Sequence, residues 1–160
     1  MSDPKWIYRF LNLAEHIGQW SKDTGAKVGC VLVNDQNRVI STGYNGPPHG
    51  VTDRSDLTRE QKLSVTLHAE ENAILFATAP LLGARAFCNY PPCSLCAARL
   101  IQVGVKEIHC YTADEAFMKR WKESLDLGER LCEEAGVTVT RHAWDHVALS
   151  HLLSSGTLVY

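Results

Sequence analysis

The chain has 160 residues, of which 45% are hydrophobic and 21% charged, and its formal net charge is −2. This length and composition are typical of one globular domain with a sizeable core, so we expect a single domain over residues 1–160. A polynucleotide-binding protein usually carries a basic surplus that neutralises phosphates, so the slightly acidic balance argues against RNA or DNA as a partner. A small anionic ligand needs only a few local cations.

The N-terminal residues 1–6 lack the basic segment and apolar run of a secretory signal, and no stretch is apolar enough to span a bilayer. We therefore expect no membrane partner and a cytoplasmic location, or the host-cell cytoplasm for a viral protein. In such a reducing compartment the six cysteines are expected as thiols or metal ligands rather than as disulfides.

Apolar residues at helical spacing predict an amphipathic helix over residues 4–20. Two short apolar runs, 28–33 and 38–41, flank the polar segment 34–37 and predict a β-hairpin. The stretch 43–50 is rich in glycine and proline, which break both helix and strand, so it is predicted to be a loop.

The second half of the chain alternates between helical and strand-like segments. It predicts helices over residues 66 to about 79, 92–103, 114–135 and 144–153, and strands over 84–90, 105–111 and 137–141. Such alternation is typical of an α/β fold with parallel pairing among the later strands, and the initial hairpin makes the sheet mixed.

Two motifs carry the chemistry: His68-Ala69-Glu70 and Pro92-Cys93-Ser94-Leu95-Cys96. A catalytic zinc takes three protein ligands and leaves one position for water, and His68, Cys93 and Cys96 supply that set. The two cysteines share one face of a predicted helix and lie in its first turn, where the helix dipole stabilises thiolates. This order of motifs is the known signature of zinc deaminases, in which Glu70 would move protons between water, the ring nitrogen and ammonia.

Two other interpretations of these motifs stay open at this point. The Cys93/Cys96 pair alone would also suit a thioredoxin-like redox protein, although that leaves His68 and Glu70 unexplained. A structural zinc site would need a fourth ligand, for which Cys88 and His109 are the nearest candidates.

Residues 68–74 together with Pro92–Cys96 resemble the cytidine-deaminase superfamily. The stretch 41–50, Ser-Thr-Gly-Tyr-Asn-Gly-Pro-Pro-His-Gly, resembles the glycine-rich loop of deoxycytidylate (dCMP) deaminases, and residues 27–29 and 102–108 also fit that family. The resemblance covers about residues 5–140. It implies a three-layer α/β fold in which helices flank a mixed five-stranded sheet.

The resemblance also implies an activity: hydrolysis of dCMP to dUMP and ammonia, which supplies dUMP for thymidylate synthesis. Such enzymes would hold zinc with His68, Cys93 and Cys96 and use Glu70 as the catalytic residue. We expect one zinc per chain, because residues 64–67 lack the extra histidine of relatives with a second zinc. Several members are homohexamers that dCTP activates and dTTP inhibits, and Mg²⁺ would accompany the triphosphate.

Asn45 and the effector site follow from the same resemblance, whereas Tyr111 is chosen because it ends a predicted strand and strand C-termini line the ligand crevice of an α/β fold. Asn45 and Tyr111 are assigned to the substrate pocket, although Asn45 could be a turn former and Tyr111 a core or rim residue. Lys27, Tyr44 and Gly46 are assigned to an effector nucleotide site, although Lys27 is as readily a solvated lysine.

Two alternative functions remain. The chain could deaminate another small cytosine compound, such as dCTP, a nucleoside or the free base. It could instead be a catalytically inactive zinc-binding regulatory domain, against which the intact Glu70 argues, because a structural zinc needs no proton carrier.

Overall fold

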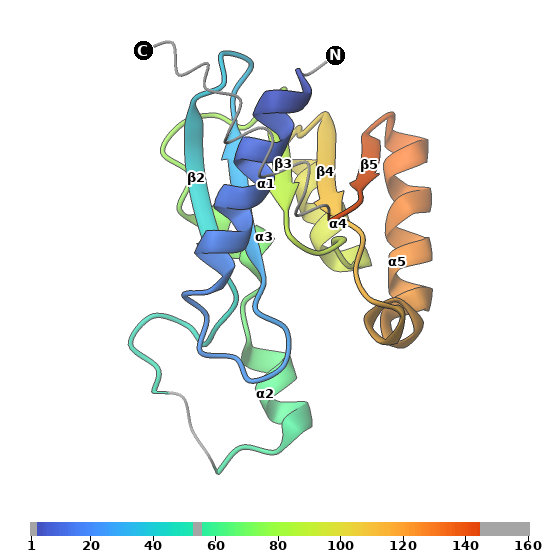
Figure 1. Ribbon diagram of the computed structural model, residues 1–160. Coiled ribbons are helices and arrows are strands. Elements are labelled where there is room, and N and C mark those ends of the chain that lie inside the picture. Colours follow the sequence, from blue (N-terminus) through green and yellow to red (C-terminus); the bar gives the residue numbers. More distant parts are fainter. Residues whose placement is uncertain (1–2, 53–55, 145–160) are drawn as a thin grey trace.

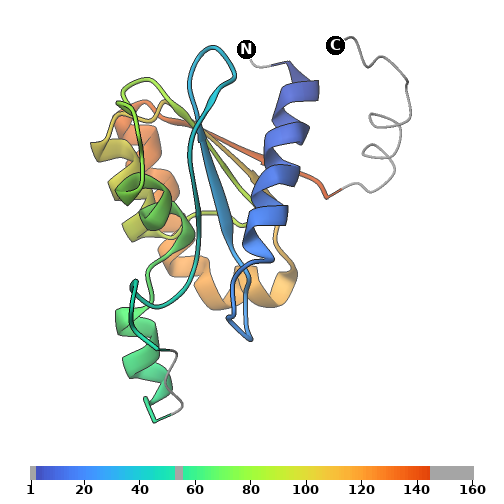
Figure 2. The same ribbon diagram turned by 90° about the vertical axis from the view of Figure 1, so that its left-hand side faces the viewer.

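The computed structural model describes residues 3–52 and 56–144, which form one five-stranded sheet with helices on both faces (Figures 1 and 2). In chain order the elements are α1 (Pro4–Gly18), β1 (Gly29–Val33), β2 (Val39–Tyr44), α2 (Arg59–Val65), α3 (Ala69–Leu75), β3 (Arg85–Cys88), α4 (Ser94–Gln102), β4 (Glu107–Tyr111), α5 (Glu115–Ala135) and β5 (Thr138–His142). Within the described residues, no helix combines the length and apolar character needed to cross a membrane.

The strand order is β2-β1-β3-β4-β5. Strand β1 pairs antiparallel with both β2 and β3, whereas β3, β4 and β5 run parallel. Figure 2 shows α1 on one side of this sheet and α3, α4 and α5 on the other. The predicted three-layer α/β fold with a mixed five-stranded sheet is therefore confirmed.

Alternation along the central strands divides the core into two layers. Cys30 and Leu32 of β1 and Cys88 of β3 belong to the core beneath α3 and α4. The intervening Val31 and Phe87 belong to the core beneath α1. Strands β1 and β3 thus bury both faces, which is why the run over β1 is continuously apolar.

Two glycines let helices approach the sheet backbone closely. A Cβ atom on Gly43 of β2 would lie 2.2 Å from the carbonyl oxygen of Ala69, in the first turn of α3. A Cβ atom on Gly29 of β1 would lie 1.9 Å from the carbonyl oxygen of Ala14 in α1. Real Cβ atoms essentially never come this close, so both contacts require glycine.

The structure corrects several predicted boundaries. The helix predicted over 66 to about 79 is shorter, because Gly46 pairs with Leu67 as an isolated β-bridge and keeps the backbone extended up to His68. Helix α2 was not predicted, although a capping box formed by Thr58 and Gln61 marks its start. Of the helix predicted over 144–153, only residue 144 lies within the described residues, and it has no regular structure.

Candidate metal centre

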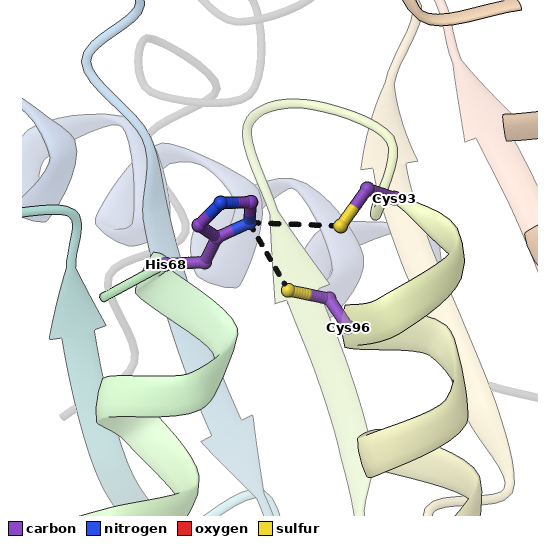
Figure 3. Close-up of side chains that lie close together, drawn as sticks. All are labelled: His68, Cys93 and Cys96. Carbon is purple, nitrogen blue, oxygen red and sulfur yellow. Dashed lines mark hydrogen bonds between the residues drawn. The ribbon is translucent and has the colours of Figure 1, made fainter. Parts of the chain in front are cut away.

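The predicted metal ligands meet where two helices begin, beside the carboxyl end of β3. His68 is the N-cap residue of α3, Cys93 is the N-cap residue of α4, and Cys96 is the third residue of α4. Figure 3 shows the imidazole of His68 reaching across from α3 toward both sulfur atoms. Neither N-cap side chain caps its own helix, so both are available to a ligand.

The distances within this group suit zinc. His68 Nδ1 lies 3.6 Å from Cys93 Sγ and 3.4 Å from Cys96 Sγ. With typical Zn–N and Zn–S bond lengths, a tetrahedral site places nitrogen and sulfur about 3.5 Å apart. All three ligand atoms lie within 4.8 Å of one another, and in the described part of the chain they form the one group of this kind. The donor set therefore fits a zinc ion with an open fourth position.

Contacts among the three ligands shift their pKa values. Hydrogen bonds from Cys96 and His68 lower the pKa of the Cys93 thiol to about 4, although burial opposes this. The same contact with Cys93, together with burial, raises the pKa of Cys96. The hydrogen bond to Cys93 also raises the pKa of His68. Because metal ligands must be deprotonated, zinc binding would release any protons that this group still holds.

Glu70 lies directly beside these ligands and is 3% exposed. Burial raises the pKa of its carboxyl group, while its own backbone N–H, the charge of His68 and a hydrogen bond with Cys96 lower it in part. A raised pKa makes the carboxylate a better proton acceptor, as a general base requires. The structure therefore brings together all four residues that the two motifs predict.

The glycine-rich loop is fastened to the start of α3. The backbone N–H of Gly46 donates to Leu67 (3.0 Å), and that of Leu67 donates back to Gly46 (2.9 Å). Asn72 Nδ2 donates to the carbonyl oxygen of Tyr44 (2.8 Å). Together with the close approach of Gly43, these contacts set the loop against the turn that carries His68 and Glu70.

Asn45 holds the backbone of a neighbouring segment. It is 8% exposed, its Oδ1 accepts from the Val28 N–H (2.9 Å), and its Nδ2 donates to the Ala26 carbonyl (3.0 Å). The Ser21 hydroxyl donates to the carbonyl oxygen of Asn45 (2.8 Å). These contacts use one acceptor position and one donor of the amide, and a contact with substrate stays a prediction.

Tyr111 lies away from the metal ligands. Its ring packs in the core beneath α1, on the opposite face of the sheet from α3 and α4, and its hydroxyl donates to Asn12 Oδ1 (2.9 Å). Burial raises the pKa of this hydroxyl to about 12. The structure thus does not bring Tyr111 together with His68, Cys93 and Cys96.

The three residues assigned to an effector site lie on connected segments. Tyr44 is 42% exposed and packs edge-to-face on Trp20, with ring centroids 6.1 Å apart. Gly46 belongs to the bridge with Leu67, and the carbonyl oxygen of Lys27 accepts from Asn89 Nδ2 (2.9 Å). A role of these residues in effector binding stays a prediction.

Neither of the fourth ligands considered for a structural zinc joins the group. Cys88 is buried in the core beneath α3 and α4, and His109 lies on the α1 side, bonded to Glu107 and His142. The group found among the described residues contains only His68, Cys93 and Cys96. This favours an open site over a closed structural one.

One positioning residue had no signal in the sequence. Asn89 is 5% exposed and precedes the cysteine motif. Its Oδ1 accepts from the Gly29 N–H (2.8 Å), and its Nδ2 donates to Glu15 Oε2 (2.9 Å). It thereby ties the segment before Cys93 to α1 and to the start of β1, contacts that no local pattern reveals.

Comparison with known proteins identifies the family. Residues 4–112 match the family described as "Cytidine and deoxycytidylate deaminase zinc-binding region". The chain is 45% identical over 137 residues to the "Uncharacterized deaminase in luxG 3'region" of Aliivibrio fischeri, covering 85% of this chain and 92% of that protein. It is 37% identical over 123 residues to the deoxycytidylate deaminase of Schizosaccharomyces pombe, covering 69% of this chain but only 38% of that protein.

The fold has a solved counterpart. The dCMP deaminase of cyanophage S-TIM5, crystallised in complex with dCMP and dUMP, superposes with a TM-score of 0.74 at 24% identity, covering 89% of this chain and all of that one. This chain therefore belongs to the cytidine and deoxycytidylate deaminase family of zinc-binding hydrolases.

Proposed function

We propose that this protein is a zinc-dependent dCMP deaminase that converts dCMP and water to dUMP and ammonia. The observation that carries the proposal is the buried Glu70 carboxyl beside an open group of His68, Cys93 and Cys96. The family supports the reaction class, and a relative named deoxycytidylate deaminase supports the substrate.

His68, Cys93 and Cys96 would hold the zinc ion, which when bound supplies Lewis-acid activation of a water molecule. Glu70 takes a proton from the attacking water, because its carboxylate lies at the same helix start as His68. Glu70 donates this proton to the ring nitrogen N3, then takes the second proton of the former water from the hydroxyl at C4 and donates it to the departing ammonia. The raised pKa of Glu70 makes its carboxylate a better base for both uptake steps. Burial keeps bulk water away from this carboxyl and strengthens its interactions.

The glycine-rich loop would form the sugar-phosphate side of the pocket, with Asn45 as its substrate contact. The loop is fastened to α3 through Gly46 and Tyr44, so a nucleotide lying on it would also lie near Glu70. We assign substrate binding to this loop rather than to Tyr111, whose ring packs on the other face of the sheet.

Nucleotide feedback extends the proposal. dCTP would activate and dTTP would inhibit at a site that includes Lys27, Tyr44 and Gly46, with Mg²⁺ on the triphosphate and a homohexamer as the assembly. Initial rates with dCMP, measured with each triphosphate and Mg²⁺, test the effectors, and light scattering tests the assembly. Unchanged rates with both triphosphates would remove the effector site from the account.

Ammonia release from purified zinc-loaded protein tests the substrate. The panel is dCMP, deoxycytidine, cytidine, cytosine and dCTP. We expect turnover of dCMP to exceed that of every other compound. A preference for another member would keep the deaminase and replace the substrate, and release of no ammonia from any member would favour an inactive zinc-binding domain.

A further inference from the structure

An ion pair joins the two metal-carrying helices close to the ligands. Arg99 Nη2 of α4 lies 3.3 Å from Glu71 Oε1 of α3. Glu71 directly follows Glu70, and Arg99 lies three residues after Cys96, on the same face of α4 and about one turn further along. The Glu71 side chain is 21% exposed and that of Arg99 is 37% exposed, so solvent screens this pair less than a fully exposed one.

The other polar contacts between these helices belong to the chemistry itself. In residues 3–52 and 56–144, they join His68 to Cys93 and Cys96, and Cys96 to Glu70. The ion pair makes no hydrogen bond with those groups, although the charge of Glu71 also acts on His68. It can therefore hold α3 against α4 whether or not a metal ion is bound.

The start of two helices at one site favours such a contact. Helices α3 and α4 begin beside the same ligand group, so the partial positive charges at their N-termini repel each other. The ligand atoms must nevertheless stay at the spacing seen between His68 and the two cysteines. An attractive pair one turn away counteracts the repulsion and reduces the reorganisation that metal binding requires.

We propose that the Glu71–Arg99 ion pair is a positioning contact that holds the metal ligands at zinc-binding distance and thereby raises the affinity for zinc. This inference concerns zinc binding alone. A different substrate, or no turnover of dCMP, would leave it intact.

Zinc affinity measured by competition with a chromogenic chelator tests the proposal. We expect Glu71→Gln and Arg99→Met each to weaken zinc binding by roughly 10–100-fold, the range of supporting residues around metal ligands. The double variant should lose no more than either single variant, because both remove one interaction. Arg99→Lys, which keeps the charge, should restore part of the affinity.

Two controls separate positioning from general stabilisation. Lys122→Met breaks the exposed Lys122–Asp126 pair on α5, far along the chain from the ligands, and should leave zinc affinity unchanged. Unfolding of zinc-loaded and zinc-stripped forms gives the second control. A positioning contact makes the loaded form lose more stability than the stripped form, since the loss includes weaker zinc binding.

Equal losses of stability in the two forms, with unchanged zinc affinity, would overturn the proposal and leave the pair as ordinary helix packing. If Arg99→Met fails to fold, Glu71→Gln carries the test, because it removes the charge with almost no change in shape. Additive losses in the double variant would also contradict the proposal.

Discussion

The N-termini of α3 and α4 differ from those of the other helices in one respect. Asp114 caps α5 by accepting the backbone N–H of Phe117 (2.9 Å), and Thr58 caps α2 through its capping box. His68 and Cys93 occupy the same position in α3 and α4 but make no side-chain cap. An N-cap contributes about 1 kcal/mol to stability. Helices α3 and α4 lack that contribution, and their N-cap side chains are available for a metal instead.

The largest expected effect comes from the carboxyl group between these uncapped helices. Glu70→Gln should lower kcat by roughly 10²–10⁴-fold, because it removes the group that carries protons. Zinc content should stay that of the wild type, since Glu70 is not among the ligands. Rates of dUMP formation and metal analysis of the same preparation check both points, and an unchanged kcat would remove Glu70 from the chemistry.

The variant Cys93→Ser converts a metal ligand into a good N-cap. Zinc affinity should fall by more than the roughly 10–100-fold typical of an outer-shell change. The zinc-stripped variant should in contrast gain up to about 1 kcal/mol from the new cap. Chelator competition and urea unfolding of stripped protein measure the two effects, and equal zinc affinity would contradict the ligand assignment.

Asp114→Ala makes the reciprocal change at a helix that binds no metal. Removing this cap should lower the free energy of unfolding by about 1 kcal/mol. Zinc affinity should not change, because Asp114 is outside the ligand group. Urea unfolding with chelator competition on the same variant checks this, and weaker zinc binding would show that α5 affects the site.

The smallest effect is a pH dependence on the opposite face of the sheet. Burial lowers the pKa of His109 and of His142, whose rings are joined by a 3.0 Å contact, while Glu107 partly raises that of His109. Lowered pKa values favour the neutral rings in the folded state. The stability that these rings contribute is therefore fully present above the unfolded pKa of about 6.5. It is lost as the pH falls through the lower folded values.

Urea unfolding of zinc-stripped protein at several pH values between about 5 and 8 measures how steeply the free energy of unfolding depends on pH. The variant His142→Asn removes one of the titrating rings and should make this pH dependence shallower. A slope identical to that of the wild type would mean that this histidine pair does not couple to folding.

Local motifs made the metal centre predictable, because spacing and helix signals put His68, Glu70 and the two cysteines at helix starts. The same local reasoning failed for Tyr111. The strand-end argument placed it at the ligand edge, but alternation along β4 turns its ring toward α1 while Cys110 faces α4. Parity along the strand, rather than position at its end, decides which face a side chain occupies.

Long-range contacts explain the other differences. The start of α3 depends on the pairing of Gly46 with Leu67, which no window of sequence around His68 contains. The ion pair between Glu71 and Arg99 likewise depends on how two helices pack. Helix α2 does not depend on such long-range contacts. Thr58 and Gln61 have the spacing of a capping box, which the sequence alone makes recognisable.

We propose that hydrolytic deamination of dCMP takes place at the group formed by His68, Cys93, Cys96 and Glu70. The most direct test is mass spectrometry of the product formed from dCMP by zinc-loaded protein in ¹⁸O-labelled water. We expect dUMP with one ¹⁸O atom at C4 and an equal amount of ammonia. Recovery of unchanged dCMP would contradict it.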